Sequence, residues 1–307
     1  MLMERNLRGY GRSRPKLVWP NGARVAVSLV VNFEEGAELA VEQGDAGNEE
    51  FGEVRSVQPS GVRDLVQEQV FDYGMRAGLW RFLEAFADAG VAATFMMCGR
   101  AVERVPDLAR AVTEAGHEPA VHGWRWLPHS HYSDRDSERR DIMKARDAIA
   151  SATGVPPVGF MCRGGQSPWT RSLLGELGFD YDSNALNDDL PYWDTLACGR
   201  HMLVLPYGFD TNDMKFFHPN GFVKPTDFSE YVGAALDVLV GEAGDGRSSM
   251  LSIGLHLRIC GRPARFAAVK AILLQLAALG DKVWIARRQE IAAHFRKMCA
   301  ISASSPS

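Results

Sequence analysis

The stretch RVAVSLVVNFEEG, residues 24–36, decides the fold of this chain. Residues 24–32 form an apolar run rich in β-branched side chains, which is typical of a strand buried on both faces of a parallel sheet. The run leads into two adjacent carboxylates, Glu34 and Glu35. Two such carboxylates at a buried strand end lose solvation and repel each other. We therefore expect that one pKa is raised or that a cation is bound.

Two later stretches have the same plan, an apolar run that ends in a histidine. In residues 119–126, PAVHGWRW, the run ends in His122 and is followed by glycine, Trp124 and Trp126. The glycine allows backbone to approach a ligand, and the tryptophans are suited to wall a pocket that excludes water. In residues 251–258, LSIGLHLR, the run ends in His256. The three stretches together predict a base and two imidazoles in one pocket.

Candidate strands and helices alternate through most of the chain, which predicts parallel β/α units. Helices are expected over residues 73–89, 105–115, 134–153, 227–240 and 267–279, and strands over 92–98, 156–162, 179–184, 202–206 and 283–286. Residues 187–193 and 206–213 are interpreted as polar, aromatic loops that either bind substrate or serve as turns and caps. The C-terminal ends of parallel strands carry the site in a β/α barrel.

Composition excludes several classes of protein. The chain has 307 residues, 46% of them hydrophobic and 23% charged, with a net charge of -4. Basic residues are scattered, so we expect no nucleic-acid or membrane partner. The five cysteines form no CxxC pair, which argues against a disulfide framework or a zinc-thiolate site. No apolar run reaches the ~20 residues that span a bilayer, and residues 1–16 have no secretory h-region. We expect a cytoplasmic protein with one domain, residues 1–300, whose first 23 residues are an extension, and a disordered tail over 301–307.

The ordered set of motifs resembles the NodB-type polysaccharide deacetylase superfamily. Within it, the chain is most similar to the branch of the cofactor-independent allantoinases and related cyclic-imide hydrolases. The resemblance covers segments from near the N-terminus to about residue 265, namely residues 8–11, 32–36, 122–126, 182–193, 210–214 and 254–263. It implies a distorted (β/α)7 barrel and, by analogy, a homo-oligomer.

The resemblance also assigns roles to the residues at the strand ends. Deacetylases of this superfamily have paired aspartates where this chain has Glu34 and Glu35, the first a general base and the second a metal ligand. They complete the metal site with His-x-x-x-His, in which His122 matches the first histidine but Trp126 stands in place of the second. Glu35 and His122 thus form an incomplete metal site. The resemblance implies either no cofactor or a weakly bound divalent ion such as zinc. His256 matches the general acid.

The leading hypothesis is a hydrolase that cleaves a C–N amide bond of a small cyclic ureide or imide. Glu34 or Glu35 activates water, His122 polarises the carbonyl and His256 protonates the departing nitrogen. The residues predicted to bind substrate are Trp124, Trp126, Arg163, Tyr192, Trp193, Asp210, Asn212 and Arg258. Two alternatives stay open. One is a metal-dependent deacetylase of an N-acetylated sugar, with a third ligand from His129 or His131. The other is a non-catalytic, ligand-binding barrel.

Overall fold

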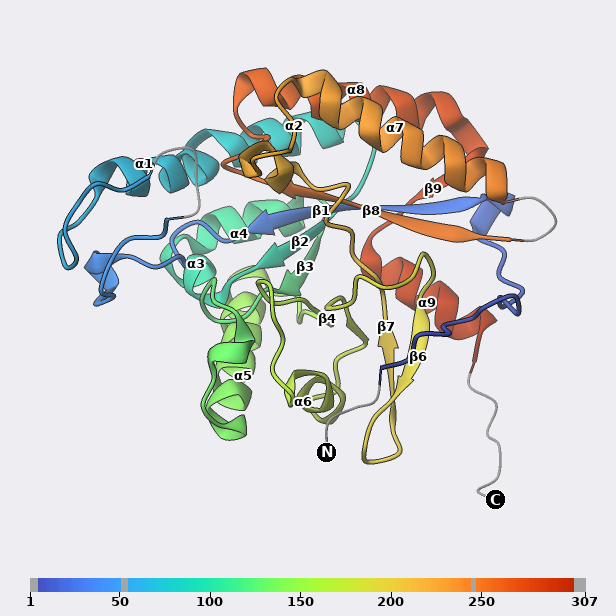
Figure 1. Ribbon diagram of the computed structural model, residues 1–307, viewed down its shortest axis with the longest axis horizontal. Helices are drawn as coiled ribbons and strands as arrows, with labels where there is room; N and C mark the ends of the chain where they lie inside the picture. Colours follow the sequence, from blue (N-terminus) through green and yellow to red (C-terminus); the bar gives the residue numbers. More distant parts are fainter. Residues whose placement is uncertain (1–4, 51–54, 244–246, 301–307) are drawn as a thin grey trace.

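Strand β1 lies at the centre of the molecule in the computed structural model, which describes residues 5–50, 55–243 and 247–300 (Figure 1). All residues of β1 (Val25–Phe33) are buried, as the apolar run predicts. The other strands of the nine-stranded sheet are β2 (Thr94–Met97), β3 (Glu118–Val121), β4 (Gly159–Phe160), β5 (Tyr181–Asp182), β6 (Tyr192–Thr195), β7 (His201–Val204), β8 (Ser249–His256) and β9 (Val283–Ile285).

The sheet is a curled, incompletely closed barrel. Its parallel strands follow the order β7-β5-β4-β3-β2-β1-β8, so strands that succeed one another in the chain are mostly neighbours. β8 pairs with β1 along its length, whereas β2 and β9 share the opposite edge of β1. Between β7 and β8 the sheet is bridged by an irregular segment, in which Asn212 pairs with Gly254. The carboxyl ends of the parallel strands therefore meet at one rim.

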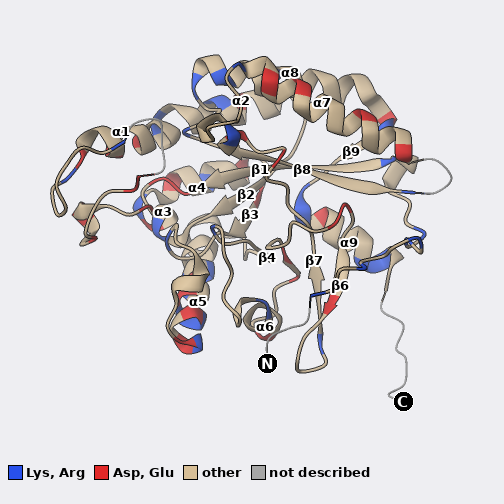
Figure 2. Cartoon of the chain, viewed as in Figure 1, with Lys and Arg blue, Asp and Glu red and all other residues tan. Residues whose placement is uncertain are grey.

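Helices cover the outside of this sheet. They are α1 (Leu65–Tyr73), α2 (Leu79–Ala89), α3 (Gly99–Arg104), α4 (Pro106–Glu114), α5 (Arg135–Thr153), α6 (Thr170–Glu176), α7 (Pro225–Glu242), α8 (Pro263–Leu279) and α9 (Arg288–Met298). Figure 1 shows α2, α7 and α8 over one side of β1 and β8, and α3, α4 and α5 on the other side of the strand ends. Acidic and basic residues alternate along these helices, most plainly along α5 (Figure 2).

The alternation of side chains along β1 separates two hydrophobic cores. Odd-numbered residues from Val25 to Phe33 pack in the core beneath the helices. Even-numbered residues such as Ala26 and Val30 pack in a second core inside the barrel. Successive side chains on a strand point to opposite faces. If this alternation continues past the end of β1, it also sets the directions of the next two side chains. It places Glu34 on the inner side and Glu35 on the outer side.

Three local predictions need correction. The helix expected over residues 73–89 begins earlier, at Leu65, where the Asp64 side chain accepts hydrogen bonds from the amides of Val66 and Gln67. It passes through a π-helical turn, Gly74–Gly78, before α2. The loop expected over 187–193 contains the start of β6, an edge strand antiparallel to β7. The short helix α3 was not expected. The predicted disordered tail, residues 301–307, lies outside the described residues.

One described segment, Pro263–Lys282, is long and apolar enough to cross a membrane by length and composition. The expectation that no segment meets these two criteria is therefore wrong. Helix α8, which makes up most of the segment, packs against α7 and α2 and contributes Phe266, Val269 and Ile272 to the core. A core helix passes the same test of length and composition, and the packing of α8 accounts for its apolar residues.

Replacing Gly78 with alanine is expected to destabilise the fold by about 1–3 kcal/mol, a typical cost of overpacking. A Cβ at Gly78 would lie 2.2 Å from the carbonyl oxygen of Leu257, in the segment that follows β8. The matched control is Gly241→Ala in α7, where a Cβ would meet no atom within 4 Å. Alanine there should stabilise the helix by roughly 0.5–1 kcal/mol. Urea unfolding measures both variants, and equal stabilities would refute the proposed close packing.

Candidate active site

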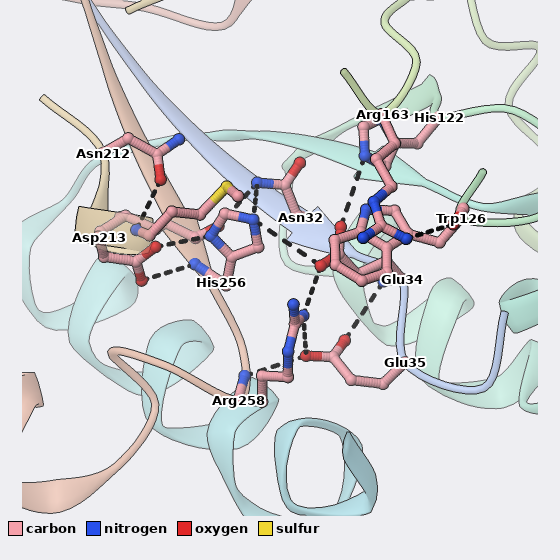
Figure 3. Close-up of polar contacts among 12 residues, drawn as sticks. Asn32, Glu34, Glu35, His122, Trp126, Arg163, Asn212, Asp213, His256 and Arg258 are labelled. Carbon is pink, nitrogen blue, oxygen red and sulfur yellow. Dashed lines mark hydrogen bonds and ion pairs between the residues drawn. The ribbon is translucent and has the colours of Figure 1, made fainter. Parts of the chain in front are cut away.

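Three side chains converge at the rim where β1, β3 and β8 end. Glu34 follows β1, His122 follows β3, and His256 is the last residue of β8. Nε2 of His122 lies 3.4 Å from Oε2 of Glu34, and Nε2 of His256 lies 3.7 Å from Oε1 of the same carboxylate. Figure 3 shows Glu34 between the two imidazoles. The three distant stretches of sequence thus meet around one buried carboxylate.

A cavity of about 210 Å³ opens over this cluster. His122, His256, Trp126 and Asn32 contribute to its lining, together with residues that follow β4, β5 and β7. Leu186 and Phe209 also line the cavity and are half exposed, which makes its mouth apolar. Convergent polar groups in a small, largely enclosed pocket are typical of a small-molecule site.

The hydrogen bonds of His122 define how its ring is protonated. Nδ1 lies 2.8 Å from the carbonyl oxygen of Met161, and a carbonyl only accepts, so Nδ1 carries a hydrogen. Nε2 then faces Oε2 of Glu34, which has no hydrogen-bond partner among the described residues. This edge of Glu34 lies beside His122, which lines the cavity, and is the part of the carboxylate without a hydrogen-bond partner among the described residues.

His256 is held by Asp213, from the segment that bridges β7 and β8. Nδ1 of His256 lies 2.6 Å from Oδ1 of Asp213, while Oδ2 accepts from the backbone amides of His256 and Cys260. Burial disfavours the charged ring, but Asp213 and Glu34 outweigh it and raise the pKa of His256 above its ordinary value. Nε2 of His256 lies 3.1 Å from Nδ2 of Asn32, another residue that lines the cavity, and 3.7 Å from Oε1 of Glu34.

The two adjacent glutamates have opposite environments. Burial by itself would raise the pKa of Glu34, but Arg258, His256 and His122 together lower it below its usual range. Burial raises the pKa of Glu35 to about 7, with Glu34 adding to the effect and Arg258 opposing it. Neighbouring carboxylates whose pKa values are pushed apart take different roles in many sites. Here Glu34 is the ionised member that faces the imidazoles.

Comparisons with known proteins identify similar sequences and structures. Residues 65–181 match the family model described as polysaccharide deacetylase. A Schizosaccharomyces pombe protein whose name places it among the polysaccharide deacetylases is 36% identical over 293 residues, 89% of this chain and 91% of that protein.

Two solved structures are also similar over nearly their whole length. A probable polysaccharide deacetylase from Pseudomonas aeruginosa PAO1 is 41% identical with a TM-score of 0.91, over 98% of this chain and 100% of that one. PuuE allantoinase is 40% identical with a TM-score of 0.91, over 98% and 99% of the two chains.

This chain belongs to the polysaccharide deacetylase family. The predicted distorted (β/α)7 barrel is confirmed. The protein is a hydrolase that acts on carbon–nitrogen bonds, which confirms the predicted class of enzyme.

The structure brings some of the predicted substrate-binding residues of this deacetylase-family enzyme to the cavity and leaves others away from it. Trp126, Arg163 and Asn212 line it. The remaining five do not line it: Trp124, Tyr192, Trp193, Asp210 and Arg258.

Each of these five has another setting in the fold. Trp124 packs against the ammonium group of Lys144, 3.6 Å from its ring centroid. Tyr192 and Trp193 lie on β6, and Asp210 lines a neighbouring cavity of about 860 Å³. Arg258 is buried beside Glu34. Binding roles for these five residues stay predictions that the resting geometry does not support.

Several residues of the site were missed in the sequence. Asn32, Asn184 and Tyr207 line the cavity, and Asp213 orients His256. Strand parity was the usable signal for Asn32, since it shares the inner side of β1 with Glu34. No local signal marks Asp213, because its contact with His256 depends on pairing between the bridging segment and β8.

The side chains present do not fit the divalent metal that this family implies. No group of three or more His, Cys, Asp or Glu residues suited to a metal occurs among residues 5–50, 55–243 and 247–300. His129, one candidate third ligand, instead contacts Glu138 at 2.9 Å within a separate buried network. His122 faces Glu34 and not Glu35, and an arginine side chain lies against both glutamates. A three-ligand site with an open position is not available here.

Proposed function

We propose that the protein hydrolyses the C–N bond of a small cyclic ureide or imide. The observation that carries the proposal is the buried carboxylate of Glu34, held between His122 and His256, two residues that line a cavity of about 210 Å³. A cavity of this size suits a compact ring better than a long glycan. The similarity to PuuE allantoinase, 40% identical over almost the whole chain, supports the same substrate class.

The chemistry begins with Glu34 ionised and His256 protonated. Glu34 removes a proton from water as the oxygen attacks the carbonyl carbon, while His122, whose Nδ1–H is bonded to the Met161 carbonyl, lies beside Oε2 of Glu34. When the tetrahedral intermediate collapses, the C–N bond breaks and the nitrogen takes a proton from Nε2 of His256. Transfer of the proton from Glu34 to His256, whose nearest atoms are 3.7 Å apart, restores the starting state.

A second candidate is hydrolysis of an N-acetyl group from a sugar. The names of the Pseudomonas and Schizosaccharomyces relatives favour it, because both refer to polysaccharide deacetylase. The donor set at the rim argues against a metal-dependent form of this reaction, since Trp126 stands where a further histidine would complete the ligands. The cytoplasmic location and the homo-oligomeric state stay predictions.

A hydrolysis screen tests the proposal. Purified protein is incubated with allantoin, hydantoin, dihydrouracil, succinimide and an N-acetylated sugar, each with and without a chelator. We expect turnover of at least one cyclic amide, with the same rate in chelator. Activity confined to the N-acetylated sugar and lost on chelation would instead establish the metal-dependent deacetylase.

A further inference from the structure

Arg258 is the least expected residue at this rim. It follows β8 by two residues, and its side chain is fully buried. Its Nη1 contacts Oε1 of Glu34 and lies 3.7 Å from Oε1 of Glu35. Its backbone amide donates to the same oxygen of Glu35 at 3.0 Å. One guanidinium is thus shared by both members of the glutamate pair (Figure 3).

The buried guanidinium of Arg258 does not use all of its hydrogen-bond donors. Nε and Nη2 of Arg258 have no hydrogen-bond partner within the described residues. The ring centroids of Phe71 and Trp126 lie 4.4 Å and 4.8 Å from its central carbon, so aromatic faces replace part of the lost hydration. Burying a charge in this way is costly unless opposite charges compensate for it. The compensation here comes from the two carboxylates.

The surrounding backbone is shaped to hold Glu35 against Arg258. A Cβ at Gly74, in the π-helical turn, would lie 2.4 Å from Oε1 of Glu35 and 3.0 Å from the amide nitrogen of Arg258. Only glycine leaves room for this approach. Glu35 therefore faces a helix and a guanidinium, whereas Glu34 faces the two imidazoles.

We propose that Arg258 is a built-in counter-cation. Its guanidinium lies against both Glu34 and Glu35, supplies the positive charge that a metal ion would bring to such a pair, and holds Glu34 in position to act as the base. Glu35 is a positioning residue that acts through Arg258 and does not touch the substrate. The guanidinium is part of the chain, and its charge is delocalised over a planar group. Unlike a catalytic metal ion, it has no open coordination position that could bind water.

An unfolding cycle tests the shared charge without any substrate. The urea midpoint is measured for Arg258→Met, Glu35→Gln and the double variant. Arg258→Met should lower the midpoint strongly, because it leaves buried carboxylates uncompensated. Adding Glu35→Gln should then recover part of that loss, because it removes one of the two buried carboxylates left without a counter-charge.

The matched control is the exposed pair Arg135 and Glu176, whose charged atoms are 2.5 Å apart. Arg135→Met and Glu176→Gln should have small and additive effects, because exposed ion pairs contribute little. Additive effects in the cycle of Arg258 and Glu35 would overturn the counter-cation role.

A kinetic comparison tests the functional part, which rests on the proposed hydrolase function. With allantoin as the probe, Arg258→Met should lower kcat by about 10²-fold or more and change KM by less than about threefold, because Arg258 does not line the cavity. Arg258→Lys should recover part of the loss, since a lysine keeps the charge but not the planar group. Glu35→Gln should keep kcat/KM within about tenfold of the wild type.

Two results would overturn this part. One is a raised KM with unchanged kcat in Arg258→Met, which would make Arg258 a substrate-binding residue. The other is loss of kcat in Glu35→Gln as large as in Glu34→Gln, which would make Glu35 a reacting group. Failure of the wild type to hydrolyse any compound in the screen would count against the proposed function alone, because the unfolding cycle decides the role of Arg258 independently.

Discussion

Replacing Glu34 with glutamine is expected to lower kcat by roughly 10³-fold, within the range lost when a general base is removed. Glutamine has nearly the same shape but takes no proton from water. The carboxylate stands between His122 and His256, and its Oε2 has no hydrogen-bond partner in the described part of the chain. KM should change little if the substrate contacts mainly the other cavity residues. Steady-state kinetics on the compound identified in the screen measures both parameters.

The control for this variant is Glu38→Gln, the same substitution four residues later. Glu38 is buried and accepts a hydrogen bond from the Gly36 amide, and it is Glu34 that lies between the two imidazoles. Burial raises the pKa of Glu38 to about 7, so near neutral pH an uncharged amide resembles one of its two populated states. Activity of Glu38→Gln close to wild type, beside a large loss in Glu34→Gln, would assign the base. Equal losses would contradict that assignment.

Replacing His256 with alanine is expected to lower kcat by about 10²–10⁴-fold, as for loss of a general acid. Without Nε2–H the departing nitrogen leaves as a poorly stabilised anion. The loss should be smaller for a substrate with a more acidic leaving nitrogen, because that nitrogen needs less protonation. A loss of equal size for leaving groups of different acidity would show that His256 has another role.

The same residue sets the alkaline limit of activity. Asp213 and Glu34 raise the pKa of His256 above its ordinary value, so the acid form persists to higher pH than in a free histidine. Activity should be present below this pKa and should fall as the pH rises through it. Asp213→Asn removes one of the charges that raise the pKa, so the alkaline limb of kcat/KM should move to lower pH. If the alkaline fall of kcat/KM occurs at the same pH in Asp213→Asn as in the wild type, ionisation of His256 does not cause that fall.

Much of the fold was predictable because it depends on local patterns. The apolar character of residues 24–32 predicts a buried strand without knowledge of its neighbours. The alternation of strands and helices along the chain leaves few topologies other than a parallel barrel. The boundaries of α1 were missed, because its exposed residues include Leu65 and Val66 and give little amphipathic signal. β6 was missed, because an edge strand gains its pairing from β7 and needs no buried pattern of its own.

The convergence of the candidate catalytic residues was also predictable, but the separate environments of the two glutamates were not. Glu34, His122 and His256 each end an apolar run, and parallel strands bring such ends to one rim. The sequence left the choice between Glu34 and Glu35 open, although the alternation along β1 contained the answer. It turns Glu34 into the barrel and Glu35 outward toward the glycines of the π-helical turn.

By itself, the sequence determined the barrel and the three strand ends that carry acid and imidazole groups, because burial and side-chain period are properties of neighbouring residues. Only the tertiary structure decided that Asp213 orients His256, and that Arg258 is buried against the two glutamates instead of lining the cavity. These contacts join residues 43 to 224 positions apart. The cost of burying charge makes them form together or not at all, and no local pattern records such a pairing.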